Sequence, residues 1–502
     1  MPAMVKPTMN FRASRNLANA YLSTCLCALL ALAAHGQTAQ SAQLRMQAVQ
    51  SHLSRYVVIR DSRNDDMNLA SQIKTLGVPA VSIAAIRNGS IDWARAYGVS
   101  SLQGAPVSTE TLFGAASISK PVTALGVLKL VEEGKIDLDT NVNKYLKRWE
   151  IPDNEFTANQ KVTVRELLNH TSGIGTHNGD IYDPSSPVPT LLQLLDGEKP
   201  ARTPPVRVEA IPGTEFAYSN GGYLILSLLI EDVTGESFAE YMKRTVLDPI
   251  GMKHSTFEAP LPLEGQAHAA TAYGADGMWA VPPSKFVSPN LAAGGLWSTP
   301  SDLARLLLEV QREYDGKSHK VLHQKTIRRM LSPGMGPAPS RRWGLGFEVS
   351  GSPEDPYIRH EGSAYFQNDM VQYLHGNGIV VMTSGGGGTA LEDEVLRSAG
   401  TVYDFPDFKS IEHSVVDVSA STLHDYVGTY AYIKVAQDGD HLTAEIPAGS
   451  PAARLHPESP TQFFILDGPQ ELSFILDSVQ KVKGMEFITP MGHHRLDKSV
   501  PQ

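Results

Sequence analysis

The sequence feature that most constrains the fold is an almost uninterrupted apolar run that follows Ser117-Ile-Ser-Lys120-Pro121. A helix formed by this run is apolar on two faces: Val122, Leu125, Leu128 and Val131 share one, and Val127 and Leu130 cover another. A helix that is apolar on nearly all sides has to be enclosed by other elements, so it belongs in the interior of a large domain. Pro121 fits the first turn, where a missing N–H removes no hydrogen bond.

Ser117 and Lys120 at the start of this helix have the types and spacing of a nucleophile and its base. Residues three apart lie on the same side of a helical turn, so the amine can reach the hydroxyl. A serine needs such a base at neutral pH, and a lysine can act as one only where burial or a nearby cation lowers its pKa. Ser-x-x-Lys alone also fits a polar helix start with a surface lysine, but the buried helix that follows argues against a surface position.

Length and composition exclude several classes of protein. At 502 residues the chain is predicted to form two or three domains. Its formal net charge of −10, without long like-charge runs, argues against a nucleic-acid binder. With 42% hydrophobic and 19% charged residues, the chain can bury enough apolar surface to fold, which excludes intrinsic disorder.

Residues 1–36 are predicted to be a secretion signal. Basic residues and no acidic ones precede the apolar run Tyr21 to Ala34, and Ala34-His35-Gly36 offers small residues for cleavage. An uncleaved N-terminal anchor is the alternative. Both cysteines, Cys25 and Cys27, lie in this run. Cleavage would leave a periplasmic or secreted chain with no membrane span, disulfide, thiol chemistry or cysteine-ligated metal.

The strand and helix signals before residue 410 predict an α+β fold. Pro79 to Arg87 and Ser90 to Tyr97 flank Asn88-Gly89, the pair that favours a type I′ hairpin turn, and a second hairpin is predicted around residues 375–378. Helix signals lie between them: a capping box at Thr163 to Glu166, a helix start at Thr299 to Asp302, and the apolar run Tyr223 to Val233. We expect an antiparallel sheet flanked by helices plus a helical subdomain over residues 45–410, with a long loop at 184–215 near the site.

From about Val415 helix signals stop and short β-compatible runs alternate with turns such as Asp438-Gly439 and Asp467-Gly468. This pattern predicts a small all-β domain, a barrel or sandwich, over residues 415–502. The predicted strands are Tyr426 to Tyr430, Leu442 to Ile446, Phe463 to Leu466, Leu472 to Leu476 and Met485 to Ile488.

Two further motifs carry chemistry. Tyr218-Ser219-Asn220 lies in a loop before an apolar helix, where it can place a phenol and an amide side by side. His360-Glu361-Gly362-Ser363 enters the second hairpin, where a glycine would let a substrate backbone approach closely. His170 is expected to fix a helix-ending turn, and His493-His494 to be an exposed strand end. No His-Glu-x-x-His or paired ligand cluster is present, so we expect neither a metal nor a cofactor.

In this order and spacing, the three motifs resemble the serine β-lactamase and penicillin-recognising (SxxK) hydrolase superfamily, in the branch with class C β-lactamases and D-aminopeptidases. The resemblance covers most of residues 75–400 and includes LLNHTSG at Leu167 to Gly173 and GGLWSTPSDLA at Gly294 to Ala304. YVGTY at Tyr426 to Tyr430 looks like the lipocalin-like appendage of some of these hydrolases.

The resemblance implies an acyl-enzyme mechanism with assigned residues. Ser117 would be the acylated nucleophile, Lys120 its partner and Tyr218 a second general acid or base. Asn220 would hold the substrate amide, and the backbone N–H groups of Ser117 and Ser363 would form the oxyanion hole. Which of Lys120 and Tyr218 takes the first proton is left open, because the two titrate together.

The motif at His360, Gly362 and Ser363 departs from the Lys-Thr-Gly of many relatives, where lysine meets a substrate carboxylate. Histidine, with an ordinary pKa near 6.5, is a poorer permanent cation. We therefore expect peptidase or amidase activity of the D-aminopeptidase kind on a peptide or small molecule. Carboxylesterase or weak β-lactamase activity is the alternative within the fold, and a penicillin-binding sensor that stays acylated is the alternative of another class. Protonation of His360 is expected to strengthen the preference for anionic substrates between about pH 8 and pH 5.5.

Overall fold

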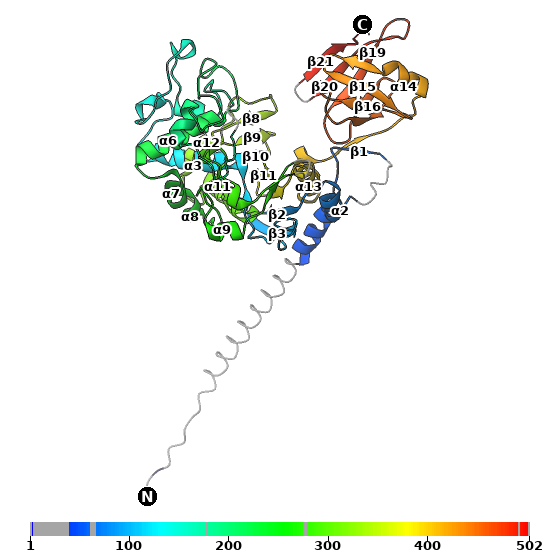
Figure 1. Cartoon of the computed structure of the whole chain (residues 1–502). Coiled ribbons are helices and arrows are strands. Elements are labelled where there is room, and N and C mark those ends of the chain that lie inside the picture. The colour runs from blue at the N-terminus through cyan, green and yellow to red at the C-terminus, as the bar shows by residue number, and fades with distance from the viewer. Residues whose placement is uncertain are drawn as a thin grey trace.

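The computed structural model describes residue 3 and residues 40–60, 67–176, 179–274, 279–489 and 492–499. The predicted secretion signal, with Cys25 and Cys27, lies outside the described residues apart from residue 3. Figure 1 shows a larger body of sheet and helices and a smaller β body at the C-terminal end. The predicted α+β fold followed by a small all-β unit is confirmed.

The centre of the larger body is a seven-stranded antiparallel sheet in the order β3-β2-β12-β11-β10-β9-β8. β2 pairs with β12 although about three hundred residues separate them, so distant parts of the chain build one sheet. The strands are β2 Ala80–Arg87, β3 Ser90–Gly98, β8 Arg341–Trp343, β9 Glu348–Gly351, β10 Pro356–Ser363, β11 Phe366–Tyr373 and β12 Gly378–Ser384.

Both predicted hairpins are present. In the turn between β2 and β3, Asn88 has φ 50° and Gly89 has φ 72°, the two positive values that a type I′ turn requires. Alternate residues of β2 face two different cores: Ala80 and Ala84 face one, and Val81 and Ile83 face the other. The sheet is therefore covered by helices on both sides, as Figure 1 shows.

The helix α3, Ser119–Glu132, lies in the larger of the two cores and is buried on nearly all sides, as its sequence predicts. Against it pack α6 Asn220–Thr234 and α10 Leu291–Gly294, while α11 Pro300–Tyr314 packs on β2, β3 and β12 in the same core. The opposite face of the sheet is covered by α13 Gly388–Tyr403, α2 Leu69–Thr75 and the helical residues 40–51.

The predicted helix starts are confirmed. Thr163 accepts a hydrogen bond from the Glu166 amide, and the Glu166 carboxylate accepts one from the Thr163 amide at 2.7 Å, which completes a capping box before α4 Val164–Leu168. Thr299 caps α11 with a single bond, since its hydroxyl accepts from the Asp302 amide at 3.2 Å. The helix predicted from the apolar run at 223 begins at Asn220 and ends at Gly235, whose φ is 75°.

The segment 184–215 is not the continuous loop that we predicted. It contains the helix α5, Leu191–Asp196, which begins with a capping box between Thr190 and Gln193 and ends at Gly197 in the left-handed region. Leu194 and Leu195 bury against the core and hold this helix in place. The sequence contains the Thr190 and Gln193 of this capping box, but the prolines on both sides of it indicate a loop.

The other helices of the larger body are α7 Phe238–Met242, α8 Asp248–Ile250, α9 Leu263–Ala267 and α12 Gln324–Met330, with the π-helical segment η4 Lys243–Leu247 and the short turns η1 Ala116–Ile118, η2 Val142–Lys144, η3 Glu155–Thr157, η5 Pro283–Lys285 and η6 Pro406–Phe408. Three two-stranded pairs accompany them: β4 Phe113–Gly114 with β7 Trp297–Ser298, β5 Ala272–Tyr273 with β6 Ala280–Val281, and β1 Val57–Ile59 with β13 Ile411–His413. Among the described residues, no helix is long and apolar enough to span a bilayer.

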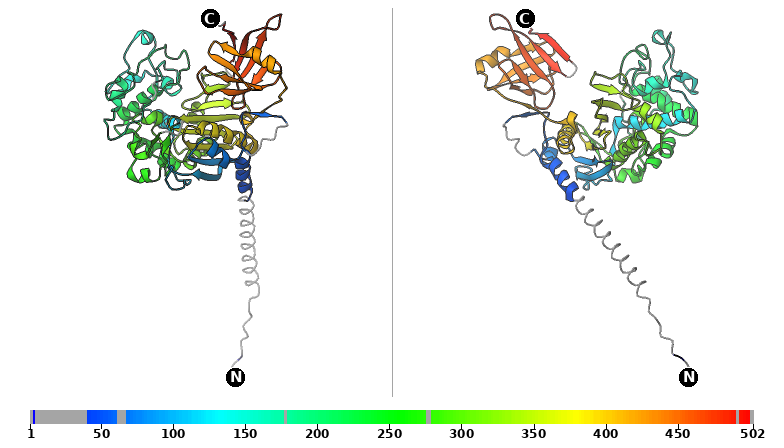
Figure 2. Two further views of the ribbon diagram at one scale, coloured as in Figure 1. Left: turned by 45° about the vertical axis from the view of Figure 1, so that its right-hand side comes forward. Right: turned by 180° about the vertical axis from the view of Figure 1, so that it is seen from behind.

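The C-terminal body is an eight-stranded antiparallel sheet, coloured orange to red in Figure 2, that is nearly closed into a barrel. A bridge between Tyr430 and Lys498, and a hydrogen bond of 2.8 Å from the Ser499 amide to the Thr429 carbonyl, join its first and last strands. The strands are β14 Gly428–Tyr430, β15 Ile433–Asp438, β16 His441–Glu445, β17 Ala453–Pro457, β18 Gln462–Phe464, β19 Glu471–Leu476, β20 Val482–Thr489 and β21 Gly492–Asp497.

The prediction that helix signals stop at about residue 415 is wrong. Ser419 caps a helix, α14 Ala420–Tyr426, through the Thr422 amide, so the first predicted strand is helical at Tyr426 and extended only from Gly428. Leu423 and Tyr426 on α14 bury in the same core as the inward side chains of the barrel. His493 and His494 lie on β21 and are both exposed, as expected.

Candidate active site

Ser117 lies in the turn η1, immediately before α3, and the backbone there is tightly fixed. Ala116 has φ 47°, a left-handed conformation that is costly for a residue other than glycine. The Ser119 hydroxyl donates to the Ala116 carbonyl at 2.7 Å and accepts from the Leu296 amide at 3.0 Å. The strained turn is therefore held by a buried side chain and orients Ser117 at the start of the helix.

Lys120 is fully buried, and its amine contacts Ser117. The Nζ atom lies 2.9 Å from the Ser117 Oγ and 3.0 Å from the Ala293 carbonyl oxygen. Burial lowers the pKa of Lys120 well below its usual value of 10.5. A neutral amine in this position can donate to the carbonyl and accept the proton of the serine hydroxyl.

Tyr218 completes the group around Ser117. The Lys120 Nζ lies 4.8 Å from the centre of the Tyr218 ring. Burial raises the pKa of the Tyr218 phenol above its ordinary value, and a hydrogen bond with Ser117 opposes that shift. The phenol therefore stays protonated and can exchange its proton with groups bound at Ser117.

Asn220 is the first residue of α6, and its backbone is fixed by two neighbours. Its backbone N–H donates to the Thr176 carbonyl at 2.9 Å. The side chain of Ser219, the N-cap, accepts from the backbone N–H of Gly222 at 3.0 Å. Tyr218 and Asn220 line different cavities rather than one. The Tyr-x-Asn motif therefore places the phenol and the amide on two sides of the nucleophile.

Two cavities meet at Ser117 and Ser363. The first has a volume of about 300 Å³ and is lined by both serines together with Asn220, Phe286 and Tyr365. The second has a volume of about 340 Å³. It is lined by both serines together with Phe216, Tyr218, Pro337, Arg341, Trp343, Glu348, His360 and Glu361. This arrangement provides separate space for two parts of a molecule bound at Ser117.

Gly362 on β10 is required by the protein's own backbone. A Cβ atom at this position would come within 2.3 Å of the Ala115 carbonyl oxygen, so no other residue fits without a shift. The prediction that this glycine makes room for a substrate backbone is corrected, because the approaching chain is the turn that carries Ser117. Asn368 fixes the same contact, since its Nδ2 donates to the Gly114 carbonyl at 3.0 Å.

His360 does not behave as its ordinary pKa suggested. The ring is 2% exposed, its Nδ1 lies 2.6 Å from the Glu361 carbonyl oxygen, and its Nε2 has no hydrogen-bond partner within the described structure. Burial, together with the nearby Lys120, lowers the pKa of His360 to about 3. The expectation that His360 gains charge between pH 8 and pH 5.5 is therefore wrong, because the imidazole stays neutral throughout that range.

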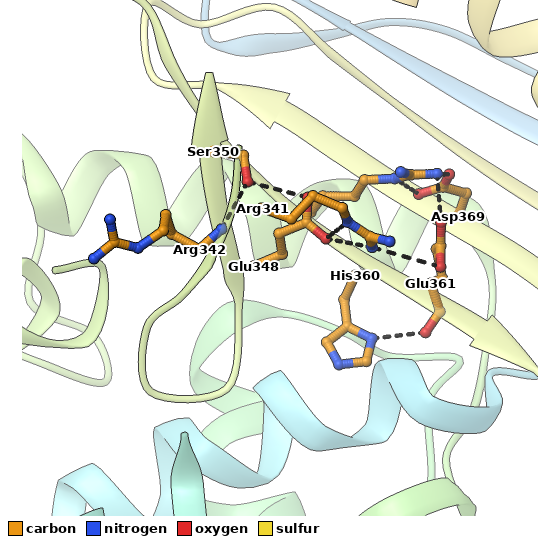
Figure 3. Close-up of polar contacts among 8 residues, drawn as sticks. Arg341, Arg342, Glu348, Ser350, His360, Glu361 and Asp369 are labelled. Atoms are coloured by element: carbon orange, nitrogen blue, oxygen red, sulfur yellow. Dashed lines mark hydrogen bonds and ion pairs between the residues drawn. The ribbon is translucent and has the colours of Figure 1, made fainter. Parts of the chain in front are cut away.

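Charged side chains next to His360 are arranged in pairs, as Figure 3 shows. Arg341 contacts Glu348 at 2.5 Å, and Arg359 contacts Asp369 at 2.5 Å and Glu361 at 2.7 Å. Arg341 and Glu361 are 43% and 50% exposed, and both line the second cavity. That cavity therefore presents a cation beside carboxylates rather than an unpaired cation.

Sequence reasoning missed the aromatic contacts that enclose Tyr218. The His170 ring lies 4.3 Å from the Tyr218 ring between centroids, and the Trp343 ring lies 5.8 Å away. Nothing in the sequence links these three residues, which come from separate segments of the chain. Among the described residues, no group of three or more His, Cys, Asp or Glu side chains could hold a metal ion.

Comparison with known proteins gives the family. The model of the family described as Beta-lactamase matches residues 66–400. Penicillin-binding protein 4* of Bacillus subtilis (strain 168) is 26% identical over 450 residues, which are 82% of this chain and 94% of that protein. Teichoic acid D-alanine hydrolase of Staphylococcus aureus is 27% identical over 237 residues, 46% of this chain, which spans about half (54%) of that relative's length.

A solved structure supports the same fold. The octameric penicillin-binding protein homologue from Pyrococcus abyssi aligns with a TM-score of 0.55 and 21% identity over 85% of this chain and 97% of its own. The family match covers more than half of the chain and includes Ser117, Lys120, Tyr218 and His360. The chain therefore belongs to the beta-lactamase family and is a serine hydrolase.

Proposed function

We propose that this protein is an exported amidase or peptidase that cleaves D-aminoacyl substrates through an acyl-enzyme formed on Ser117. The observation that carries the proposal is the 2.9 Å contact between the Ser117 hydroxyl and the buried Lys120 amine. A serine hydroxyl is a poor nucleophile unless a base lies at hydrogen-bond distance, and a neutral amine in this position can act as that base.

In the first step, the Ser117 Oγ attacks the substrate carbonyl carbon and its proton passes to the Lys120–Tyr218 pair. The oxyanion that forms is stabilised by the backbone N–H groups of Ser117 and Ser363, aimed at charge that exists only in the tetrahedral state. The carbon–nitrogen bond then breaks, and the departing amine takes a proton from Tyr218. In the second step, water gives a proton to the same pair and attacks the ester on Ser117, which releases the acid and restores the hydroxyl.

The two cavities suggest how the substrate lies. Tyr218, the proton donor to the leaving group, lines the second cavity, so the leaving group occupies that space. Asn220 lines the first cavity, where its amide would hold the acyl part. This assignment follows from the role of each side chain, since proton transfer needs contact with the departing atom.

The charges of the second cavity support a neutral leaving group. His360 is uncharged, and Arg341, the cation among the described residues that line this cavity, contacts Glu348. A carboxylate-bearing leaving group would also approach the exposed carboxylate of Glu361. These features favour aminopeptidase or amidase chemistry over carboxypeptidase or β-lactamase chemistry. The name of one relative, teichoic acid D-alanine hydrolase, supports a D-aminoacyl group, and the predicted signal at residues 1–36 supports export.

A fluorophosphonate probe followed by a substrate panel tests the proposal. Ser117→Ala should abolish labelling and turnover, whereas Ser288→Ala, which removes another serine from the first cavity, should keep the labelling. The panel contains D- and L-alanyl p-nitroanilides, p-nitrophenyl esters and a chromogenic cephalosporin. Sustained release from the D-alanyl anilide is expected. Labelling at another serine would reject the nucleophile, and a single-turnover burst would indicate an acylated sensor instead.

A further inference from the structure

We infer that His170 is a positioning residue that holds the Tyr218 phenol against Ser117, by binding the backbone N–H groups of Ala217 and Ser219 and stacking on the Tyr218 ring. This inference rests on the proposed function, because it assigns His170 to the proton-transfer step of that reaction. His170 contacts neither Ser117 nor either cavity among the described contacts, so it acts through Tyr218.

The first observation is the backbone. The Ala217 amide donates to the His170 carbonyl at 2.8 Å, and the Ser219 amide donates to the His170 Nδ1 at 3.1 Å. The residues before and after Tyr218 are therefore both bound to one residue of another segment. His170 can make the two bonds at once because its φ of 61° turns the chain sharply after α4. The predicted helix-ending turn at His170 is present, and it serves to hold the loop that carries Tyr218.

The second observation is the ring. The imidazole and the phenol lie 4.3 Å apart with an angle of 31° between their planes, close enough for direct stacking. Trp343 and Tyr223 each lie 5.5 Å from the imidazole, so the ring is enclosed by aromatic side chains. His170 is fully buried, and a shift of its ring would leave a void beside Tyr218.

The third observation is the protonation state. Because the Nδ1 accepts the Ser219 amide, the proton of the neutral ring sits on Nε2. Burial, the nearby Lys120 and His360 together lower the pKa of His170 well below its usual value. The charged or titratable groups around it are Lys120, His360, Tyr218 and Tyr223. The imidazole therefore acts on Tyr218 through its acceptor nitrogen and its ring, and not through a charge.

Two substitutions separate the two kinds of contact. His170→Asn keeps an acceptor at the same distance from Cα and tolerates the positive φ, but it removes the ring. His170→Phe keeps a ring and removes the acceptor for the Ser219 amide. Since positioning requires both contacts, we expect kcat to fall at least tenfold in each variant while KM changes less than twofold. Both variants should retain the circular dichroism spectrum of the folded protein.

A double-mutant cycle with Tyr218→Phe gives the decisive result, with the rate of Ser117 labelling by the fluorophosphonate as the readout. If His170 acts through the phenol, His170→Asn should slow labelling at least tenfold in the wild-type background and less than twofold in the Tyr218→Phe background. An equal loss in both backgrounds, or full kcat in His170→Asn, would overturn the inference. Failure of Ser117 labelling in the wild-type protein would instead reject the proposed function. Should His170→Phe not fold, His170→Asn still decides the question.

Discussion

Replacing Lys120 by methionine should change how the stability of the protein depends on pH. Methionine has a similar length and no charge, so it fills the space of the buried lysine. In the wild-type protein, unfolding transfers the amine from the buried site, where burial lowers its pKa, to water, where its pKa returns to about 10.5. Unfolding therefore takes up a proton at any pH between the folded-state pKa and 10.5.

The size of the effect follows from proton linkage. Where the unfolded chain binds one more proton than the folded chain, the free energy of unfolding rises by about 1.4 kcal/mol per pH unit. The wild-type protein should thus gain stability as the pH rises, and Lys120→Met should lack this contribution. Any stability advantage of the variant should shrink by about 2 kcal/mol between pH 7.5 and pH 9. The lost hydrogen bonds to Ser117 and Ala293 displace the whole curve but do not change its slope.

Urea unfolding followed by tryptophan fluorescence measures this difference in the part of the chain that contains Lys120. All five tryptophans lie between residues 93 and 343, inside the family match, and none lies in the barrel. Lys129→Met, at a partly exposed position of the same helix, is the control for the loss of a lysine. Lys120→Met should also lose about a thousandfold in kcat/KM, since it removes a proton acceptor.

The reasoning is refuted if the stability difference between the wild type and Lys120→Met is constant from pH 7.5 to pH 9. A constant difference would mean that Lys120 keeps its proton in the folded protein. It could then not accept the serine proton without first losing its own, and Tyr218 would be left as the first base. If the stability difference changes with pH as expected but Lys120→Met keeps its activity, then Lys120 is neutral in the folded protein but is not needed for the reaction.

Two further predictions concern specificity and domain structure. The ratio of kcat/KM for matched carboxylate and carboxamide substrates should stay constant between pH 8 and pH 5.5, because the pKa of His360 is about 3. A ratio that rises towards pH 5.5 would show that His360 does titrate there. A chain ending at Ser414, just after β13, should keep a folded, fluorophosphonate-reactive body, because the buried cores of the sheet and of the barrel share no residue; an insoluble product would show that the barrel is part of one folding unit.

Most of the fold was predictable because its signals are local. Asn88-Gly89 sets a hairpin turn, Thr163 and Glu166 form a capping box, and the apolar run after Lys120 makes a buried helix wherever it lies. The errors fall where long-range burial, and not a local signal, decides the structure. The helices α5 and α14 are short, and their existence depends on the burial of Leu194, Leu195, Leu423 and Tyr426 against distant parts of the chain.

The residues of the candidate site were predictable from the sequence, but their burial and their contacts were not. The order of the motifs singled out Ser117, Lys120, Tyr218 and His360. In the structure Ser117 lines both cavities, Tyr218 and His360 line the second, and Lys120 contacts Ser117 from the core. The sequence could not show that His360 is buried, because the polar residues beside it indicate an exposed strand end. Nor could it show that Gly362 is required by the Ala115 carbonyl, since the two positions are about 250 residues apart.

The burial that lowers the pKa of Lys120 also affects the charged states of its neighbours. Lys120 lies close enough to His170 and His360 to lower the pKa of each, so a charge on any one of the three would oppose charge on the others. The charges of Arg341 and Arg359 are instead compensated by the carboxylates of Glu348, Asp369 and Glu361, which contact them. A lysine at position 360, in a site that is 2% exposed, would have to be paired in the same way or lose its proton. A neutral histidine at this position therefore adds no charge that would shift the pKa of the Lys120 amine further.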